Sequence, residues 1–235
     1  MTGVSPYSAA FDELTPHERY KLLCAAICPR PIALVTSMSA SGVVNAAPFS
    51  FFNVFSEDPA LIVLGLQHRA HPDGGGYIPK DTTRNIAASG VFVVNMVDED
   101  LAEAMNITAI QFPPDISEVD AAGLVLAPGV DIAVPHLAAA PFAFECRKSV
   151  SLSFGPHREL LVGERLRIHA RSGLVDPATL RVSLDAYKPV GRMFANDYAR
   201  QSDRFEMTRD SYEDWAKAQD TAQEKAQEKA REPAR

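Results

Sequence analysis

The sequence has no excess of positive charge and no long apolar run, and each absence excludes a class of protein. Its 235 residues include 23 Lys and Arg against 30 Asp and Glu, which gives a formal net charge of −7. We therefore expect no nucleic-acid partner, because binding to a phosphate backbone depends on basic residues that release counterions. No apolar run approaches the roughly 20 residues needed to span a bilayer, so we expect no membrane segment.

Cysteine is also scarce. Cys24, Cys28 and Cys146 form an odd set without a paired framework. Together with the lack of a recognisable signal peptide, they predict a reducing, cytoplasmic setting. The helical spacing of Cys24 and Cys28 favours two small apolar residues on one helix face over a metal or redox pair. His68 and His71 have no third ligand at a recognised spacing, so we expect no metal site.

The rest of the composition is that of an ordinary globular chain. Apolar residues make up 46% of the sequence and charged residues 23%. The length fits one large domain, or a domain with extensions, that can bury a sizeable core. We predict three parts: an N-terminal extension and helix over residues 1–28, the main domain over 29–207, and a charged tail over 208–235. The tail has no apolar stripe, which indicates a solvated helix or a disordered segment.

Residues 30–58 organise the chain. Ile32–Ser37 predicts a strand, and after a turn Val43–Ala47 predicts a second strand that returns as a hairpin. Pro48 cannot donate to a sheet ladder, so regular pairing should end there. Phenylalanines then surround short polar side chains, at Phe49, Ser50, Phe51, Phe52, Asn53, Phe55 and Ser56. A flat apolar ligand with a polar edge would suit both groups, and a buried strand with a satisfied polar turn would suit them equally.

Local signals outline the other elements. A capping box at Thr15–Glu18 begins a helix that should end near Ile27. The glycine-rich segment 67–80 indicates a mobile loop or a flap over a pocket. The remaining patterns predict a strand buried on both faces at Ala60–Leu66, a helix from Asp81 that stops at Gly90, a strand at Val91–Val97, a loop at Pro113–Ala122, and strands at Phe142–Leu152 and Leu160–Ala170.

The helix that begins at Asp81 offers a place for a phosphate. Its first backbone N–H groups are free and carry a partial positive charge. Lys80 precedes this turn and Arg84 lies within it. An ordinary helix cap with solvated charges is the alternative, because Asp or Thr is common at that position.

Two motifs carry a resemblance to a known family. The first is RPIALVTS followed by G-x-x-N-x-A-P-F-S-x-F-N and D-P, and the second is Pro79-Lys80-Asp81-Thr82-x-x-Asn85-Ile86 followed by Phe92-Val-Val-Asn95. In this order they resemble the signatures of the flavin reductase-like family of FMN-binding split barrels. The resemblance covers roughly residues 29–171 and, more weakly, the stretch to Tyr198. It implies a mainly β (α+β) fold, a split β-barrel with peripheral helices.

The resemblance also implies a function. The chain resembles proteins that reduce FMN with NAD(P)H, and FAD is the other flavin that such proteins could use. The resemblance also implies a homodimer that holds the flavin near its interface. A monooxygenase or another acceptor would then receive the reduced flavin. Hydride transfer to flavin needs little acid–base help from the protein, which explains the lack of a catalytic triad or a dinucleotide glycine fingerprint. An FMN-bound electron carrier similar to flavoredoxin, and a flavin-binding module without catalysis, remain alternatives.

Site residues follow from the same resemblance. Asn45 and residues 47–53 should line the isoalloxazine, and Lys80 to Thr82 should mark the phosphate end. Members of the family carry Gly-Asp-His where this chain has Gly155-Pro156-His157, so His157 is either a catalytic residue at the nicotinamide or a solvent-facing histidine. The implied cofactor-binding residues are Arg30, Thr36, Ser37, Asn45, Ala47, Pro48, Phe49, Ser50, Phe51, Asn53, Lys80, Asp81, Thr82 and Asn85.

Overall fold

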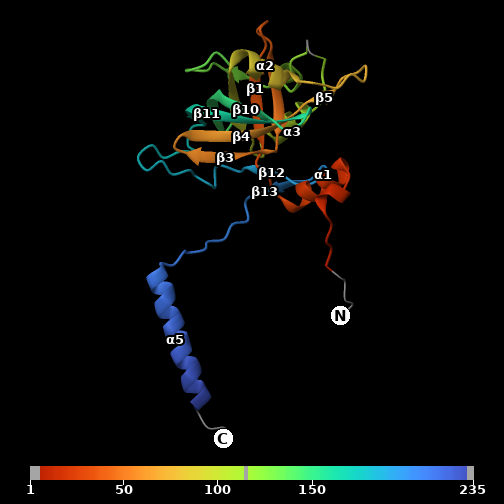
Figure 1. The fold of residues 1–235 in the computed structure, drawn as a ribbon. Helices are drawn as coiled ribbons and strands as arrows, with labels where there is room; N and C mark the ends of the chain where they lie inside the picture. Colours follow the sequence, from red (N-terminus) through yellow and green to blue (C-terminus); the bar gives the residue numbers. More distant parts are fainter. Residues whose placement is uncertain (1–5, 114–115, 232–235) are drawn as a thin grey trace. The chain divides into compact units, whose positions relative to one another are not determined.

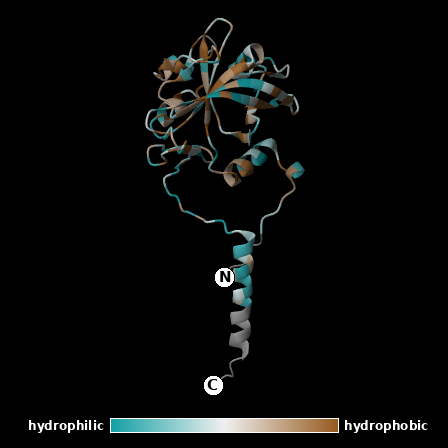
Figure 2. Cartoon of the chain, turned by 90° about the vertical axis from the view of Figure 1, so that its left-hand side faces the viewer, coloured by the Kyte–Doolittle hydropathy of each residue, from teal (hydrophilic) through white to brown (hydrophobic). Residues whose placement is uncertain are grey.

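The computed structural model describes residues 6–113 and 116–231 (Figure 1). The described chain forms two compact units, one up to Ser202 and one from Asp203 onward. The first unit contains both sequence motifs. The second contains one long helix, α5 (Tyr212–Arg231), whose described side chains are mainly hydrophilic (Figure 2). The predicted boundary between residues 207 and 208 stays a prediction.

An antiparallel sheet of seven strands dominates the first unit. Its strands are β1 (Ala33–Met38), β2 (Val44–Phe49), β3 (Phe52–Glu57), β4 (Ala60–Gln67), β7 (Val91–Met96), β10 (Phe142–Ser153) and β11 (Arg158–Ala170). Their order across the sheet is β2-β1-β7-β10-β11-β4-β3. The mainly β fold that we predicted is confirmed.

The sheet is strongly curled, although it is not closed by pairing. β2 and β3 form its two opposite edges, yet they follow each other in the chain through Ser50 and Phe51 alone. Phe49 and Phe52 are three residues apart and so lie within about 10 Å of each other. The two edges must therefore meet at the Ser50–Phe51 corner, where the Phe51 carbonyl accepts a hydrogen bond from the Gly65 N–H at 2.7 Å.

Side chains alternate between two cores on either face of the sheet, as strand geometry requires. Leu34 and Val93 pack on one face with residues of the connecting helices. Val35 and Val94 pack on the other face with Leu64 and the residues around it. Both cores are almost fully shielded from solvent, so the sheet is a rigid frame for the loops at its ends.

Short helices and small strand pairs complete the first unit. The helices are η1 (Phe11–Glu13), α1 (Pro16–Ala26), α2 (Asp81–Ser89), α3 (Ala102–Ile107) and α4 (Glu118–Ala121). The strand pairs are β5 (Arg69–Ala70) with β6 (Tyr77–Ile78), β8 (Leu126–Ala127) with β9 (His136–Leu137), and β12 (Val190–Arg192) with β13 (Tyr198–Arg200). Figure 1 shows α2 at one end of the unit and α1, with β12 and β13, at the other.

The helix boundaries follow the sequence signals. Thr15 and Glu18 form the predicted capping box, with Thr15 N donating to Glu18 Oε2 at 2.8 Å. Gly90 ends α2 in the left-handed region, at φ 74°, where glycine has no steric penalty. The predicted loop 113–122 is wrong in part, because Glu118–Ala121 forms α4. Residues 114 and 115 of that loop lie outside the described residues.

Two predictions about strands are wrong. Pairing does not end before Pro48, because Pro48 lies opposite Leu34 within β2. β2 is an edge strand, so Pro48 loses no hydrogen bond when its nitrogen faces away from the sheet. β4 is not buried on both faces, since Ile62, Leu64 and Leu66 are buried while the residues between them are partly exposed.

Candidate functional site

A cavity of about 610 Å³ opens at the corner where the sheet edges meet, and we call it the corner pocket. Its walls come from the end of β2 and the Ser50–Phe51 corner, the end of β4, the start of α2, the segment after α3, and the start of β11. Both sequence motifs reach it. The predicted residues that line it are Asn45, Ala47, Pro48, Phe49, Ser50, Phe51, Lys80, Asp81 and Thr82.

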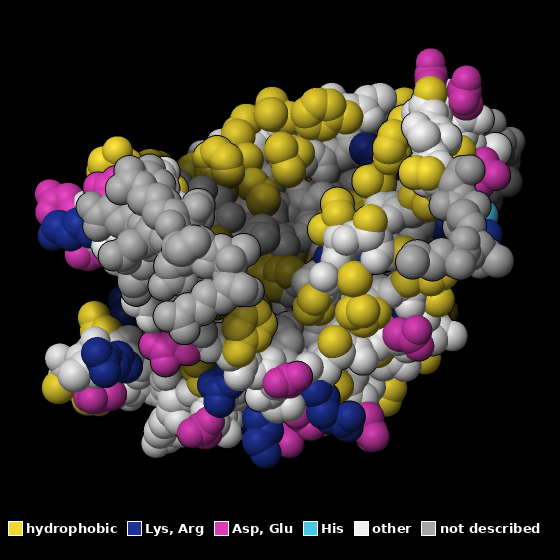
Figure 3. Space-filling model, turned by 90° about the horizontal axis from the view of Figure 1, so that it is seen from below, with side chains coloured by type: hydrophobic (Ala, Val, Ile, Leu, Met, Phe, Trp, Pro, Cys, Tyr) yellow, Lys and Arg dark blue, Asp and Glu magenta, His cyan; other side chains and the backbone are white. Residues whose placement is uncertain are grey.

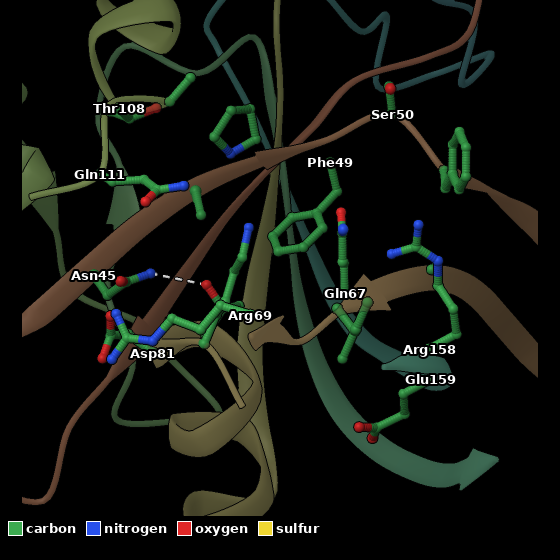
Figure 4. Close-up of a pocket in the computed structure, with 18 of the residues that line it drawn as sticks. Asn45, Phe49, Ser50, Gln67, Arg69, Asp81, Thr108, Gln111, Arg158 and Glu159 are labelled. Carbon is green, nitrogen blue, oxygen red and sulfur yellow. Dashed lines mark hydrogen bonds between the residues drawn. The ribbon is translucent and has the colours of Figure 1, made fainter. Parts of the chain in front are cut away.

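Polar groups from three elements meet at the α2 end of the corner pocket. Asn45 and Thr82 are joined by a hydrogen bond of 3.0 Å (Figure 4). In the amide orientation that satisfies both of its ends, Asn45 also donates to Glu118 Oε1 at 3.3 Å. Lys80 is the N-cap of α2 and makes no side-chain capping bond. The first N–H groups of this helix therefore face the pocket without a side-chain cap.

Two carboxylates also line this end, and their surroundings differ. Asp81 forms an ion pair with Arg84 in the first turn of α2. Glu118 accepts a hydrogen bond from the Ala46 N–H at 3.3 Å. Burial raises the pKa of Glu118 above its ordinary value, and the nearby charge of Asp81 adds to this rise, against backbone hydrogen bonds that lower it. Glu118 is therefore more easily neutral than an exposed glutamate.

The opposite end of the pocket carries a different pair of charges. Arg158 lies opposite Gln67 in the register of β11 and β4. Its neighbour Glu159 pairs with His68 at 3.2 Å, whereas the Arg158 guanidinium has no hydrogen bond or ion pair within residues 6–113 and 116–231. Figure 4 shows Phe49 between the two ends, with Asn45 on one side and Arg158 on the other.

Gly65 holds the apolar wall of the pocket close to the corner. A Cβ atom at this position would lie 2.9 Å from Phe51 Cβ. The backbones of Gly65 and Phe51 are joined by a hydrogen bond of 2.7 Å. This close approach of β4 to Phe51 therefore requires glycine at position 65. Leu66 and Leu160 extend the same wall.

Several predicted site residues lie beside the corner pocket rather than in its lining. Arg30 is buried and donates to the carbonyls of Cys24 (2.6 Å), Ile27 (3.0 Å) and Met193 (2.9 Å). Its Nε lies 3.4 Å from Oγ of Ser50, so it supports a lining residue. Arg30 therefore connects the C-terminal end of α1 to the corner of the sheet by hydrogen bonds.

Thr36, Ser37 and Asn85 are buried in the frame behind the pocket. Thr36 donates to the Pro135 carbonyl at 2.7 Å. Asn85 Nδ2 donates to Ser37 Oγ at 3.2 Å, which ties α2 to β1. These contacts position the first turn of α2, and a direct role of the three residues toward a cofactor stays a prediction.

Asn53 and His157 also lie outside the lining of the corner pocket. Asn53 is exposed on β3 and accepts a hydrogen bond from the Val54 N–H at 2.8 Å. The His157 ring stacks on Tyr77 of β6 with ring centroids 4.9 Å apart. This stack ties the turn before β11 to the glycine-rich segment, and a nicotinamide role for His157 stays a prediction.

The sequence reading missed part of the lining. Arg69, Arg158, Gln67, Gln111 and Glu118 all face the pocket. Four of them stand at the end of a strand or in a connection, and Glu118 is the first residue of the short helix α4, all places where a polar residue is ordinary. Only the proximity of these segments in space distinguishes them from solvated loop residues. Within the part of the chain that the structure describes, no group of three or more His, Cys, Asp or Glu side chains could hold a metal ion.

Comparisons with known proteins assign this curled antiparallel sheet and its corner pocket to the class of flavin-binding oxidoreductases and electron-transfer proteins. The model of the flavin reductase like domain matches residues 25–191, so the chain belongs to this family. No helix of the described residues is long and apolar enough to cross a membrane.

Relatives extend the likeness over most of the chain. It is 39% identical to the uncharacterized protein BH2278 of Halalkalibacterium halodurans, over 84% of this chain and 94% of that one. Among solved structures, it is similar to the 2-nitrobenzoate 2-nitroreductase NbaA of Pseudomonas fluorescens, with 38% identity, a TM-score of 0.79 and coverage of 88% and 98%. It is also similar to component B of nitrilotriacetate monooxygenase from Bacillus cereus, with 34% identity, a TM-score of 0.81 and coverage of 87% and 100%.

Proposed function

We propose that the chain binds FMN in the corner pocket and catalyses the reduction of this flavin by NAD(P)H. One observation carries the proposal: Asn45 with residues 47–51, and residues 80–82, come from two separate motifs and line one cavity of about 610 Å³. This volume lies within the range of about 300–1,000 Å³ that is usual for sites of organic ligands and cofactors.

The lining fits the parts of a flavin mononucleotide. Phe49, Phe51 and Leu160 supply an apolar wall for a planar ring system, and Asn45 supplies amide groups for its polar edge. The N-terminus of α2 supplies backbone N–H groups and a partial positive charge for the phosphate. Lys80 adds a full positive charge at the same place.

The acidic residues at the phosphate end are compatible with this placement. Asp81 is paired with Arg84, and the raised pKa of Glu118 favours its neutral form. A neutral Glu118 can donate a hydrogen bond to a phosphate or ribityl oxygen, whereas its carboxylate would repel the phosphate. The protonation state of Glu118 therefore changes the affinity of this end of the pocket for an anion.

When bound, the flavin supplies the hydride-accepting chemistry of the reaction. The protein has three tasks around it: the apolar wall excludes water from the ring, Asn45 and Ser50 orient the polar edge, and the α2 end holds the phosphate. NADH or NADPH is the proposed electron donor, and FAD is the alternative flavin.

A homodimer is part of the proposal, supported by an apolar outer face of the sheet. Val150, Val162 and Val63 lie in one row across β10, β11 and β4, and Leu152 and Leu160 lie in the next. Val150 and Leu152 are each more than 40% exposed. Seen from below, the surface carries further exposed hydrophobic side chains (Figure 3). A contiguous exposed apolar face favours burial against a second copy.

The acceptor of the reduced flavin would be a monooxygenase or another oxidant, in keeping with the likeness to a monooxygenase component. An FMN-bound electron carrier is the alternative, because such a protein would use the same pocket but exchange electrons with a protein donor. The cytoplasmic setting remains a prediction from the sequence.

Titration of the purified protein with FMN, followed by steady-state oxidation of NADH and NADPH, tests the proposal. We expect saturable FMN binding and flavin-dependent NAD(P)H oxidation. Stoichiometric FMN that only a protein donor reduces would instead support the carrier. Absence of flavin binding by spectroscopy and calorimetry would overturn both functions.

Light scattering tests the dimer. Leu152→Asp places a charge on the apolar outer face and should shift the mass from dimer to monomer. Val125→Asp is the matched control, because Val125 is also exposed (68%) but belongs to the short segment before β8. A monomeric wild-type protein would show that the outer face is not a dimer interface.

A further inference from the structure

A second cavity, of about 650 Å³, lies on the other side of the Pro48–Ser50 segment, and we call it the arginine chamber. It is bordered by α1, by the end of α3 and by the β12–β13 pair. The first motif contributes Ile32 and residues 48–50 to its lining, and the function proposed above leaves this cavity without a role.

The two cavities share a wall. Tyr20, Pro48, Phe49, Ser50 and Ala109 line both of them. A molecule in the arginine chamber would therefore lie against the same segment that faces a flavin in the corner pocket. This adjacency is what a second substrate of a flavin enzyme requires.

The chemistry of the chamber points to one kind of ligand. Among its lining residues, all of them described, Arg192 is the only one with a charged side chain. The Arg192 guanidinium lies 4.5 Å from the centre of the Tyr198 ring and also hydrogen bonds to the Ala195 carbonyl. Asn106 and Asn196 add amide groups to the lining. One cation, two amides and the rings of Tyr20 and Tyr198 suit a planar molecule with one anionic group.

The support beneath Arg192 is rigid. Its backbone N–H donates to the Arg30 carbonyl at 2.8 Å, and its carbonyl accepts from the Arg30 N–H at 3.0 Å. Gly191 packs so closely on Pro29 that a Cβ atom would come within 2.5 Å of it. The guanidinium therefore belongs to a strand that is hydrogen bonded to the segment just before β1. A side chain on such a fixed backbone is pre-organised, which lowers the entropic cost of binding.

We infer that the arginine chamber is a binding site for a small aromatic carboxylate, with Arg192 as the residue that recognises the anionic group. This inference rests on the proposed function, because it makes the chamber the site of a substrate beside the flavin. The carboxylate would accept hydrogen bonds from the guanidinium and an amide, and the aromatic ring would pack between the tyrosine rings. No electron transfer to this ligand is needed for the binding itself.

Sodium benzoate is the probe, titrated calorimetrically into the FMN-loaded protein. We expect saturable binding at one site for each chain. Arg192→Met, which keeps an unbranched apolar stem but removes the guanidinium, should weaken benzoate binding about tenfold or more, as expected for a lost charge-assisted contact. Arg192→Lys should retain part of the affinity.

Two further variants separate recognition from folding. Asn106→Asp places a carboxylate in the lining, at an exposed position of α3, and should also weaken benzoate binding. Arg200→Met is the matched control: Arg200 lies on β13, pairs with Glu99 at 2.9 Å and does not line the chamber. FMN affinity should stay unchanged in all four variants.

The outcomes distinguish the inference from the function on which it rests. If the wild-type protein binds no FMN, the proposed function fails first. If FMN binds but benzoate does not, or if Arg200→Met weakens benzoate as much as Arg192→Met, the chamber assignment is wrong. If inorganic phosphate displaces benzoate and Arg192→Met raises the KM for NADPH, the chamber holds a phosphate of the dinucleotide, and the aromatic carboxylate is excluded.

Discussion

Replacement of Lys80 by alanine tests the phosphate end of the corner pocket most directly. Lys80 lies at the N-cap of α2 and lines the pocket beside Thr82. FMN differs from riboflavin by a phosphate group that carries a charge of about −1.5 to −2 at neutral pH. The two ligands share every other contact, so the difference between their losses of affinity isolates the phosphate.

The size of the effect follows from the exposure of Lys80. Two unit charges 4 Å apart at a protein surface attract by about 4 kcal/mol before desolvation is subtracted. Because the Lys80 side chain is exposed, we expect a net loss of about 1–3 kcal/mol for FMN, or roughly 5–150-fold in the dissociation constant. Riboflavin should lose less than about twofold. Added salt should reduce the difference, since it screens exposed charges.

Fluorescence titration of FMN and riboflavin measures both constants on the same protein. Lys21→Ala is the matched control, because Lys21 is an exposed lysine on α1 that lines neither cavity. Equal losses for FMN and riboflavin in Lys80→Ala would refute the placement of the phosphate at α2. An equal loss in Lys21→Ala would attribute the effect to net charge alone.

The remaining predictions concern Glu118, Gly65 and the tail. Glu118→Gln should bind FMN several-fold more tightly than wild type at pH 8, and this advantage should vanish as the pH falls through the raised pKa of Glu118. Titrations with FMN across this pH range measure the two dissociation constants. A ratio of the two constants that does not change with pH would count against a role of the Glu118 carboxyl. Gly65→Ala should lower the stability by about 1–3 kcal/mol and weaken flavin binding, because its Cβ would meet Phe51 at 2.9 Å; thermal melts should show no such loss for Gly75→Ala, which has open space. Deletion of the chain after Trp215 should leave flavin affinity, reductase rate and dimer mass unchanged, and a lost dimer in light scattering would show that the tail takes part in the interface.

Local signals in the sequence determined several elements. The Thr15–Glu18 capping box begins α1, Gly90 ends α2, and two strand segments joined by a turn predict the β1–β2 hairpin. These signals depend on backbone conformation and on contacts within a few residues. The two flavin motifs could also be recognised in the sequence, because each depends on the identity and spacing of residues within a short segment.

Only the tertiary structure decided which residues share the corner pocket. Glu118 and Arg158 reach the pocket that Asn45 lines because α4 packs on β2 and β11 lies beside β4. The same strand order buries Thr36 and Ser37 behind the pocket, where Thr36 donates to the Pro135 carbonyl and Ser37 accepts a hydrogen bond from Asn85. Strand order and register are set by the burial of two cores between segments far apart in the chain. No local pattern of residues records that arrangement, which is why the full lining of the pocket appears only in the folded chain.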